Sequence, residues 1–138
     1  MFSLKAIIAK RMLKKSMDRT RLSDKRFCES CRRDHWSERE CEIAVKIRRV
    51  IAELADVDRR EILPEFTFAG QISTLGWWRD YDLYEFAKEL KGELGVDISG
   101  KIHGCNTTFE LVTNSTVSII DFVRDVVELC QSQKDGRG

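Results

Sequence analysis

Hydrophobic residues that recur at helical spacing in three segments constrain the fold of this chain of 138 residues more than any other feature. The segments span residues 38–55, 81–95 and 116–131, and in each the apolar side chains return every three or four positions. That spacing places them on one face of an α-helix. The only proline, Pro64, lies between the first two segments. No stretch alternates strongly enough to predict a strand, so we expect an all-α fold with three main helices.

Polar residues at the ends of these segments predict where the helices begin and end. Ser37 and Glu40 form a capping-box pattern in front of the first helix. Asp80 is suited to cap the second helix, and Gly95 suits the left-handed position that follows it. Between these two helices, Asp58 is placed to cap a single helical turn. The loop after Gly95 has room for another short turn.

Charge is divided unevenly along the chain. Residues 1–37 contain 11 Lys and Arg against 4 Asp and Glu, whereas the rest of the chain contains 13 against 19. We therefore divide the chain into a basic N-terminal arm over 1–37, a helical domain over 38–131 and a flexible tail over 132–138. The net charge of +1 conceals this asymmetry.

The arm itself has two parts. Leu4, Ile7 and Ile8 share one side of a basic amphipathic helix predicted over residues 3–17, and residues 18–36 look polar and irregular. A solvated extension is the simplest interpretation. Nucleic acid or an anionic membrane, bound through residues 1–27, is a minor alternative.

The first residues of the chain do not have the pattern of a secretory signal. Lys5 and Lys10 interrupt the apolar residues there, so the uninterrupted apolar core of such a signal is missing. We therefore expect a cytoplasmic location. In that compartment the five cysteines are expected to be reduced thiols.

Three stretches of the chain share their hydrophobic pattern with one known family. They are Ile51–Val57 with Phe66–Phe68, Asp82–Phe86 with Leu94–Ile98, and Thr116–Val123. Over residues 40–130 this pattern resembles the acyl carrier proteins. The stretch 96–100 also resembles an uncharacterised bacterial group of carrier-like proteins that lack the attachment serine. The resemblance implies a carrier-like bundle of three main helices.

Acyl carrier proteins hold phosphopantetheine on a serine at the start of their second helix. The resemblance places Asp80 at that position, and an aspartate has no hydroxyl to phosphorylate. We therefore expect no phosphopantetheine and no other cofactor. Ser73 is the only serine in the preceding connection. It leaves open one alternative, a genuine acyl or peptidyl carrier modified on an unconventional serine.

In carriers the acidic second helix docks onto basic patches of enzymes, so the resemblance implies recognition of a protein partner. Aromatic residues ringed by charge are a common composition for such contacts. The residues expected at the contact are Trp77, Trp78, Asp80, Tyr81, Asp82, Tyr84, Glu85 and Glu89. We predict a non-catalytic protein-interaction module whose partner carries a basic docking patch.

A second alternative is a zinc-stabilised binding module. Cys28, Cys31, His35 and Cys41 are of the types that zinc prefers, and Cys28-x-x-Cys31 has the spacing of a zinc knuckle. Enzyme activity is not expected, because neither His35 nor His103 lies beside a recognisable nucleophile. No phosphate-binding loop or dinucleotide fingerprint occurs either.

Overall fold

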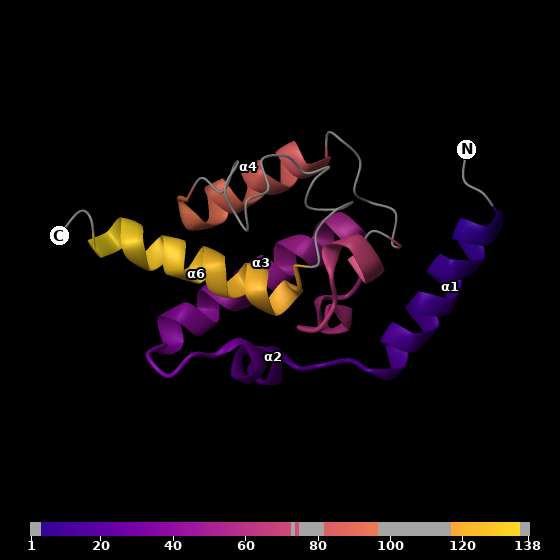
Figure 1. Cartoon of the computed structure of the whole chain (residues 1–138), viewed down its shortest axis with the longest axis horizontal. Coiled ribbons are helices and arrows are strands. Elements are labelled where there is room, and N and C mark those ends of the chain that lie inside the picture. The colour runs from indigo at the N-terminus through magenta and orange to yellow at the C-terminus, as the bar shows by residue number, and fades with distance from the viewer. Residues whose placement is uncertain (1–3, 73, 75–81, 97–116, 136–138) are drawn as a thin grey trace.

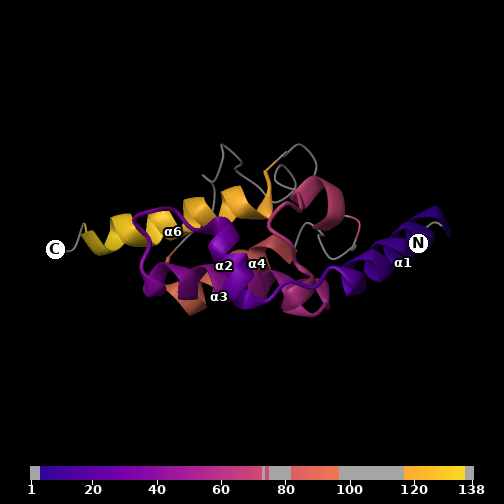
Figure 2. The same ribbon diagram turned by 90° about the horizontal axis from the view of Figure 1, so that it is seen from below.

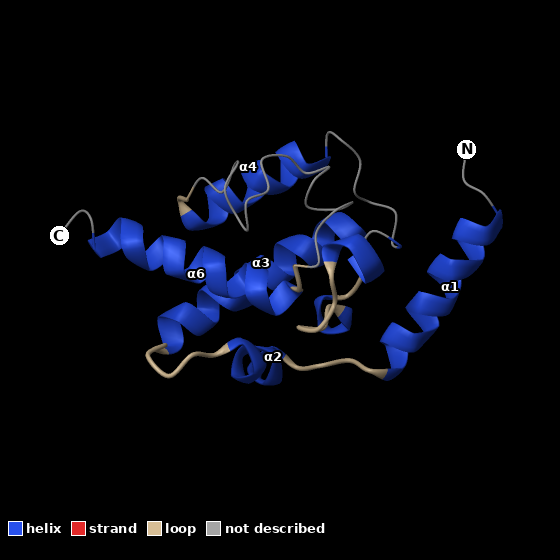
Figure 3. Cartoon of the chain, viewed as in Figure 1, coloured by secondary structure: helices blue, strands red, loops and turns tan. Residues whose placement is uncertain are grey.

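The computed structural model describes residues 4–72, 74, 82–96 and 117–135. Within these residues the protein consists of five α-helices and two short helical turns, without a strand (Figures 1 and 3). The helices are α1 (Leu4–Arg19), α2 (Asp24–Cys31), α3 (Glu38–Ala55), α4 (Asp82–Leu94) and α6 (Ile119–Asp135). The turns are η1 (Arg59–Glu61) and η2 (Phe68–Ile72). None of the described helices is long and apolar enough to cross a bilayer.

The three main helices predicted from hydrophobic spacing are confirmed as α3, α4 and α6. The capping box of α3 is present, because the Glu40 carboxylate accepts a hydrogen bond from the Ser37 amide at 2.8 Å. Asp56, with φ 55°, ends α3, and Gly95, with φ 71°, follows α4. Asp58 caps η1 as predicted, since its carboxylate accepts from the Arg60 amide at 2.8 Å.

The hydrophobic core lies around α3, which contacts α2, α4 and α6. In Figure 1, α3 and α6 lie between α4 and α2. Phe122 of α6 joins two parts of this core. Its ring centroid lies 5.1 Å from that of Phe68 in η2 and 5.6 Å from that of Phe86 in α4. The side chains that α3 contributes to the same core include Ile47 and Ile51, both fully buried.

Helix α2 contradicts the prediction that residues 18–36 are irregular. Ser23 caps this helix, because its hydroxyl accepts from the Arg26 amide at 3.2 Å. Phe27 and Cys31 are fully buried, and Trp36 in the following turn is 2% exposed. The core therefore includes residues from the predicted basic arm, because these side chains pack against α3 and α6. At the other end of the chain, α6 continues to Asp135, into the predicted tail.

Helix α1 confirms that the predicted amphipathic segment is helical. In two perpendicular views it extends away from the other helices, with its N-terminal end farthest out (Figures 1 and 2). Half-buried Leu13 packs against the core. Most other described side chains of α1 are exposed.

Candidate functional site

Helix α4 presents an exposed acidic side. Glu85 and Glu89 are exposed, and Glu93 lies four positions further on. This spacing aligns the three carboxylates along one side of the helix, which we call the acidic stripe. Phe86 and Leu90 are fully buried on the adjoining side and hold α4 against the core. The stripe is therefore displayed from a helix whose rotation is fixed by packing.

An ion pair fixes one end of the acidic stripe. Arg49 of α3 contacts the Glu93 carboxylate at 2.9 Å and the Glu53 carboxylate at 3.7 Å. Lys88 and Lys91 are exposed further round α4, so cations border the stripe on one side. Glu85 and Glu89 thus form the part of the stripe farthest from Arg49 along the helix.

The structure describes part of the predicted contact. Glu85 and Glu89 lie on the acidic stripe, while Asp82 and Tyr84 lie in the first turn of α4. The remaining predicted residues lie outside the described part of the chain: Trp77, Trp78, Asp80 and Tyr81, together with the alternative attachment residue Ser73.

The cysteines of the predicted zinc set have other roles. Cys28 of α2 and Cys41 of α3 form a disulfide bond, with their Cα atoms 5.4 Å apart. The expectation of reduced thiols is therefore wrong for this pair, because α2 packs on α3 with these two residues facing each other. The thiol of Cys31 is free and buried, and His35 is exposed. In the part of the chain that the structure describes, no three His, Cys, Asp or Glu residues are grouped so as to hold a metal ion.

The Cys31 thiol is also expected to be unreactive. Burial raises its pKa to about 12, although Arg124 and Arg48 favour the thiolate to a smaller extent. A neutral, buried thiol is a poor nucleophile and a poor metal ligand. The Arg124 side chain instead donates to the Cys31 carbonyl at 2.9 Å, which joins α6 to the end of α2. Cys31 therefore serves packing.

A cleft of about 380 Å³ opens between the start of α3 and the end of α6. Its lining residues are His35, Ser37, Arg39, Glu40, Ile43, Cys130 and Gln131. Hydrogen bonds from Ser37 and from the Gln131 amide, the latter at 3.0 Å, lower the pKa of Glu40 to about 2. Burial raises the pKa of the Cys130 thiol. At neutral pH the cleft thus holds an ionised, hydrogen-bonded carboxylate beside a neutral thiol, which is no acid–base pair.

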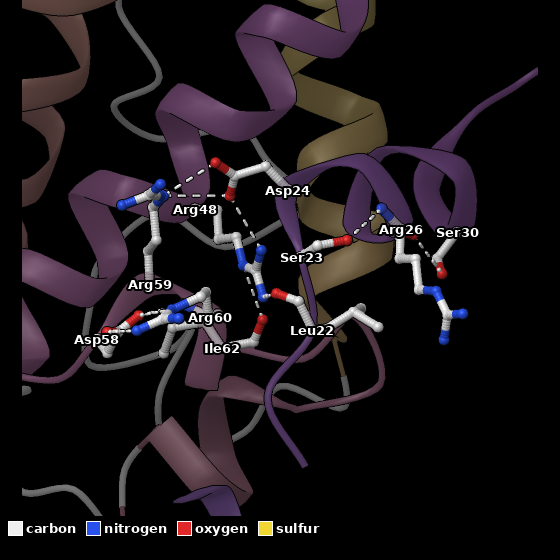
Figure 4. Close-up of polar contacts among 10 residues, drawn as sticks. All are labelled: Leu22, Ser23, Asp24, Arg26, Ser30, Arg48, Asp58, Arg59, Arg60 and Ile62. Carbon is white, nitrogen blue, oxygen red and sulfur yellow. Dashed lines mark hydrogen bonds and ion pairs between the residues drawn. The ribbon is translucent and has the colours of Figure 1, made fainter.

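A fully buried arginine was missed by the sequence analysis (Figure 4). The Arg48 guanidinium donates to the carbonyls of Leu22 at 2.7 Å and Ile62 at 3.0 Å, and to the Asp24 carboxylate at 3.1 Å. Its central carbon also lies 4.5 Å from the centroid of the Phe27 ring. Burial lowers the pKa of Arg48 and Asp24 opposes that shift. An arginine remains charged in either case.

The Arg48 cluster is structural, because the buried guanidinium is paired with two backbone carbonyls and with the partly buried Asp24 carboxylate. A second cation supports it, since Arg59 contacts the Asp24 carboxylate at 2.9 Å (Figure 4). The sequence did contain a signal for this residue. Position 48 follows Ala44 by four and precedes Ile51 by three, so it falls on the buried side of α3.

Comparison with protein-family models, with curated proteins and with solved structures gives no match for this chain.

Proposed function

We propose that this chain is a non-catalytic, carrier-like domain that binds a protein partner through the acidic stripe of α4. The observation that carries the proposal is the exposure of Glu85 and Glu89 on a helix whose other side is locked into the core by Phe86 and Leu90. A fixed helix holds its charges in a constant pattern, which suits recognition of a complementary surface.

The stripe has a cost to the helix that carries it. Each pair of like charges four positions apart destabilises a helix by at most about 0.5 kcal/mol. Glu85, Glu89 and Glu93 contain two such pairs. Arg49 offsets this repulsion at Glu93. A partner with a basic patch would offset it at Glu85 and Glu89, and would also be steered towards the stripe.

The resemblance to acyl carrier proteins supports the same proposal. In that family the acidic second helix is the docking element, and α4 is the second of the three main helices here. The aspartate at position 80 removes the hydroxyl that would carry phosphopantetheine. Binding without a covalent arm is therefore the activity we propose. A cytoplasmic location belongs to the same proposal, although a disulfide such as that between Cys28 and Cys41 is uncommon in that compartment.

Charge reversal on the stripe tests the binding. The variant Glu85→Lys with Glu89→Lys should lose the proteins that the wild-type chain captures from a cell extract, as measured by mass spectrometry. Raised salt should elute the same proteins, because screening weakens exposed charge pairs. The matched control is Glu29→Lys with Glu42→Lys, which makes the same change of charge at exposed positions of α2 and α3. An unchanged set of captured proteins in the stripe variant would contradict the proposal.

The intact mass of the chain tests the absence of an arm. After co-expression with a broad-specificity phosphopantetheinyl transferase, we expect the unmodified mass, because Asp80 cannot accept the group. A gain of one phosphopantetheine would show that another residue carries the arm. The variant Ser73→Ala would then identify whether Ser73 is the acceptor.

A further inference from the structure

The exposed large hydrophobic side chains of the described residues all belong to α1. They are Leu4 (72% exposed), Ile7 (41%), Ile8 (48%) and Met12 (67%). Their spacing of three, four and eight positions from Leu4 puts them on one side of the helix. Single exposed hydrophobic residues are common on protein surfaces. Four on one side of one helix form an apolar surface of the kind that marks an interaction site.

Positive charge surrounds this apolar side. Residues 4–17 contain five cations and no acid: Lys5, Lys10, Arg11, Lys14 and Lys15. Arg11 and Lys15 continue the line of Leu4 and Ile8 towards the C-terminal end of α1. This side is therefore apolar over Leu4, Ile7 and Ile8, whereas further along the helix Met12 lies between the cations Arg11 and Lys15.

The apolar side also faces away from the rest of the protein. Half-buried Leu13 packs against the core. It lies nine positions after Leu4, which places it on the opposite side of the helix. Both views show α1 extending outwards from the bundle, and only the short segment 20–23 separates it from α2 (Figures 1 and 2). A broad surface could thus approach Leu4, Ile7 and Ile8 from outside.

We infer that α1 binds the surface of an anionic lipid bilayer. Helices with apolar and basic residues of this kind lie in the bilayer interface, where apolar side chains enter the acyl boundary and cations contact the lipid phosphates. The first half of α1 would enter more deeply. Arg11 and Lys15 would extend along the helix and keep their charges among the headgroups.

Two other occupants fit the surface less well. Nucleic acid would pair with the cations but would leave the four apolar side chains in water. The acidic stripe of a second copy would supply negative charge, yet the adjoining Phe86 and Leu90 are fully buried and offer α1 no apolar surface. An anionic bilayer satisfies both requirements. The inference is independent of the function proposed for α4.

Vesicle co-sedimentation of the full chain tests the inference. One set of vesicles contains phosphatidylcholine alone, and in the other about a third of that lipid is replaced by phosphatidylserine. We expect the chain to sediment with the anionic vesicles, to remain free of the neutral ones, and to dissociate as salt is raised. Hydrogen exchange in α1 should slow when the anionic vesicles are added.

Variants separate the two contributions. Ile7→Gln with Ile8→Gln should weaken partitioning by about tenfold or more, because it removes the inserted apolar area. Arg11→Gln with Lys15→Gln should weaken it about fivefold for each lost charge. The matched control, Lys25→Gln with Arg26→Gln, removes the same charge from exposed positions of α2 and should bind like the wild type.

Three results would overturn the inference. Equal sedimentation of the wild type and the Ile7 and Ile8 variant would show that the apolar side is not inserted. If the wild type does not sediment with anionic vesicles, the bilayer is not the occupant. This holds whether or not the chain binds DNA or RNA. A concentration-dependent dimer that is abolished by the Ile7 and Ile8 substitutions would identify a second copy instead.

Discussion

Helices α1 and α2 are neighbours in the same basic stretch of the chain, yet they relate to the core in opposite ways. Helix α1 has 16 residues and exposes four large hydrophobic side chains. Helix α2 has only 8 residues, and buries Phe27, Cys28 and Cys31. The longer and more apolar helix lies outside, while the shorter one is part of the core. Specific contacts, rather than hydrophobic content, determine which helix docks.

The contacts of α2 explain the difference. A helix as short as α2 is not stable alone in water, so it depends on the rest of the protein. Arg48 holds its beginning through Leu22 and Asp24, and the bond between Cys28 and Cys41 ties its middle to α3. For α1, half-buried Leu13 is the hydrophobic residue that packs against the core among those described.

The largest effect is expected when the arginine anchor is removed. Arg48→Ala should lower the free energy of unfolding by about 3–5 kcal/mol, because it leaves buried polar partners without their charged donor. Those partners include the Leu22 and Ile62 carbonyls. Urea-induced unfolding measures this loss. If Arg48 docks α2, the fluorescence of Trp36, which is buried in the wild type, should also change in the folded variant.

Two further variants sharpen this result. Arg48→Met keeps much of the buried volume but none of the hydrogen bonds, so its stability should lie between those of the wild type and Arg48→Ala. Arg26 lies on the exposed side of α2. Its replacement by alanine should change the stability by less than about 0.5 kcal/mol. A loss below about 1 kcal/mol in Arg48→Ala, within the range of one ordinary hydrogen bond, would refute the proposed anchoring.

The disulfide is expected to have the next largest effect. It joins Cys28 to Cys41, which are 13 positions apart. Cys41→Ser should lower the free energy of unfolding by about 3 kcal/mol, the value expected for a closed loop of this length. Unfolding of the wild type with and without a reductant provides a second measurement. The reduced wild type should match the variant, and the variant should not respond to reductant.

The disulfide also bears on the cellular location of the chain. A stable disulfide such as the one between Cys28 and Cys41 is uncommon in a reducing cytoplasm. Alkylation of free thiols in intact cells, before the chain is extracted, would show whether Cys28 and Cys41 are bonded to each other in the cell. If the wild type were equally stable with and without reductant, the disulfide would contribute nothing to the docking of α2.

The smallest effect is expected at α1. Ile7 and Ile8 are both exposed. Replacing the two with glutamine should therefore change the free energy of unfolding by less than about 0.5 kcal/mol. Urea-induced unfolding of this variant completes the comparison with Arg48→Ala. A loss above about 1 kcal/mol would mean that Ile7 and Ile8 also pack on the core, and the contrast between the two helices would fail.

Features encoded locally were predictable from the sequence. The start of α3 follows from Ser37 and Glu40, its end from the hydrophobic spacing over residues 38–55, and the end of α4 from Gly95. The exposure of Glu85 and Glu89 follows from helical spacing in the same way. Periodicity and capping operate within a few residues, so one sequence carries enough information to locate them.

Features that depend on distant partners were not predictable. Helix α2 escaped notice because its stability comes from Arg48, 24 residues after Asp24, and from packing against α3. Cys28, Cys31, His35 and Cys41 were grouped as a possible zinc set with reduced thiols, whereas Cys28 and Cys41 form a disulfide bond between two helices. The cleft beside Glu40 also depends on Gln131, which is 91 residues away. Such contacts follow from how the helices pack, which no local pattern encodes.

The anchoring of Leu22 has a mechanical consequence. Its amide donates to the Arg60 carbonyl at 2.8 Å and its carbonyl accepts from Arg48, so its backbone is held on both sides shortly after α1 ends. Helix α1 is thus a rigid rod about 24 Å long, and the backbone just after its C-terminal end is fixed to the domain. A surface bound to the N-terminal end of α1 would therefore not be joined to the domain by a flexible linker. It would keep the domain within about one helix length and would transmit its pull directly to η1 and α3.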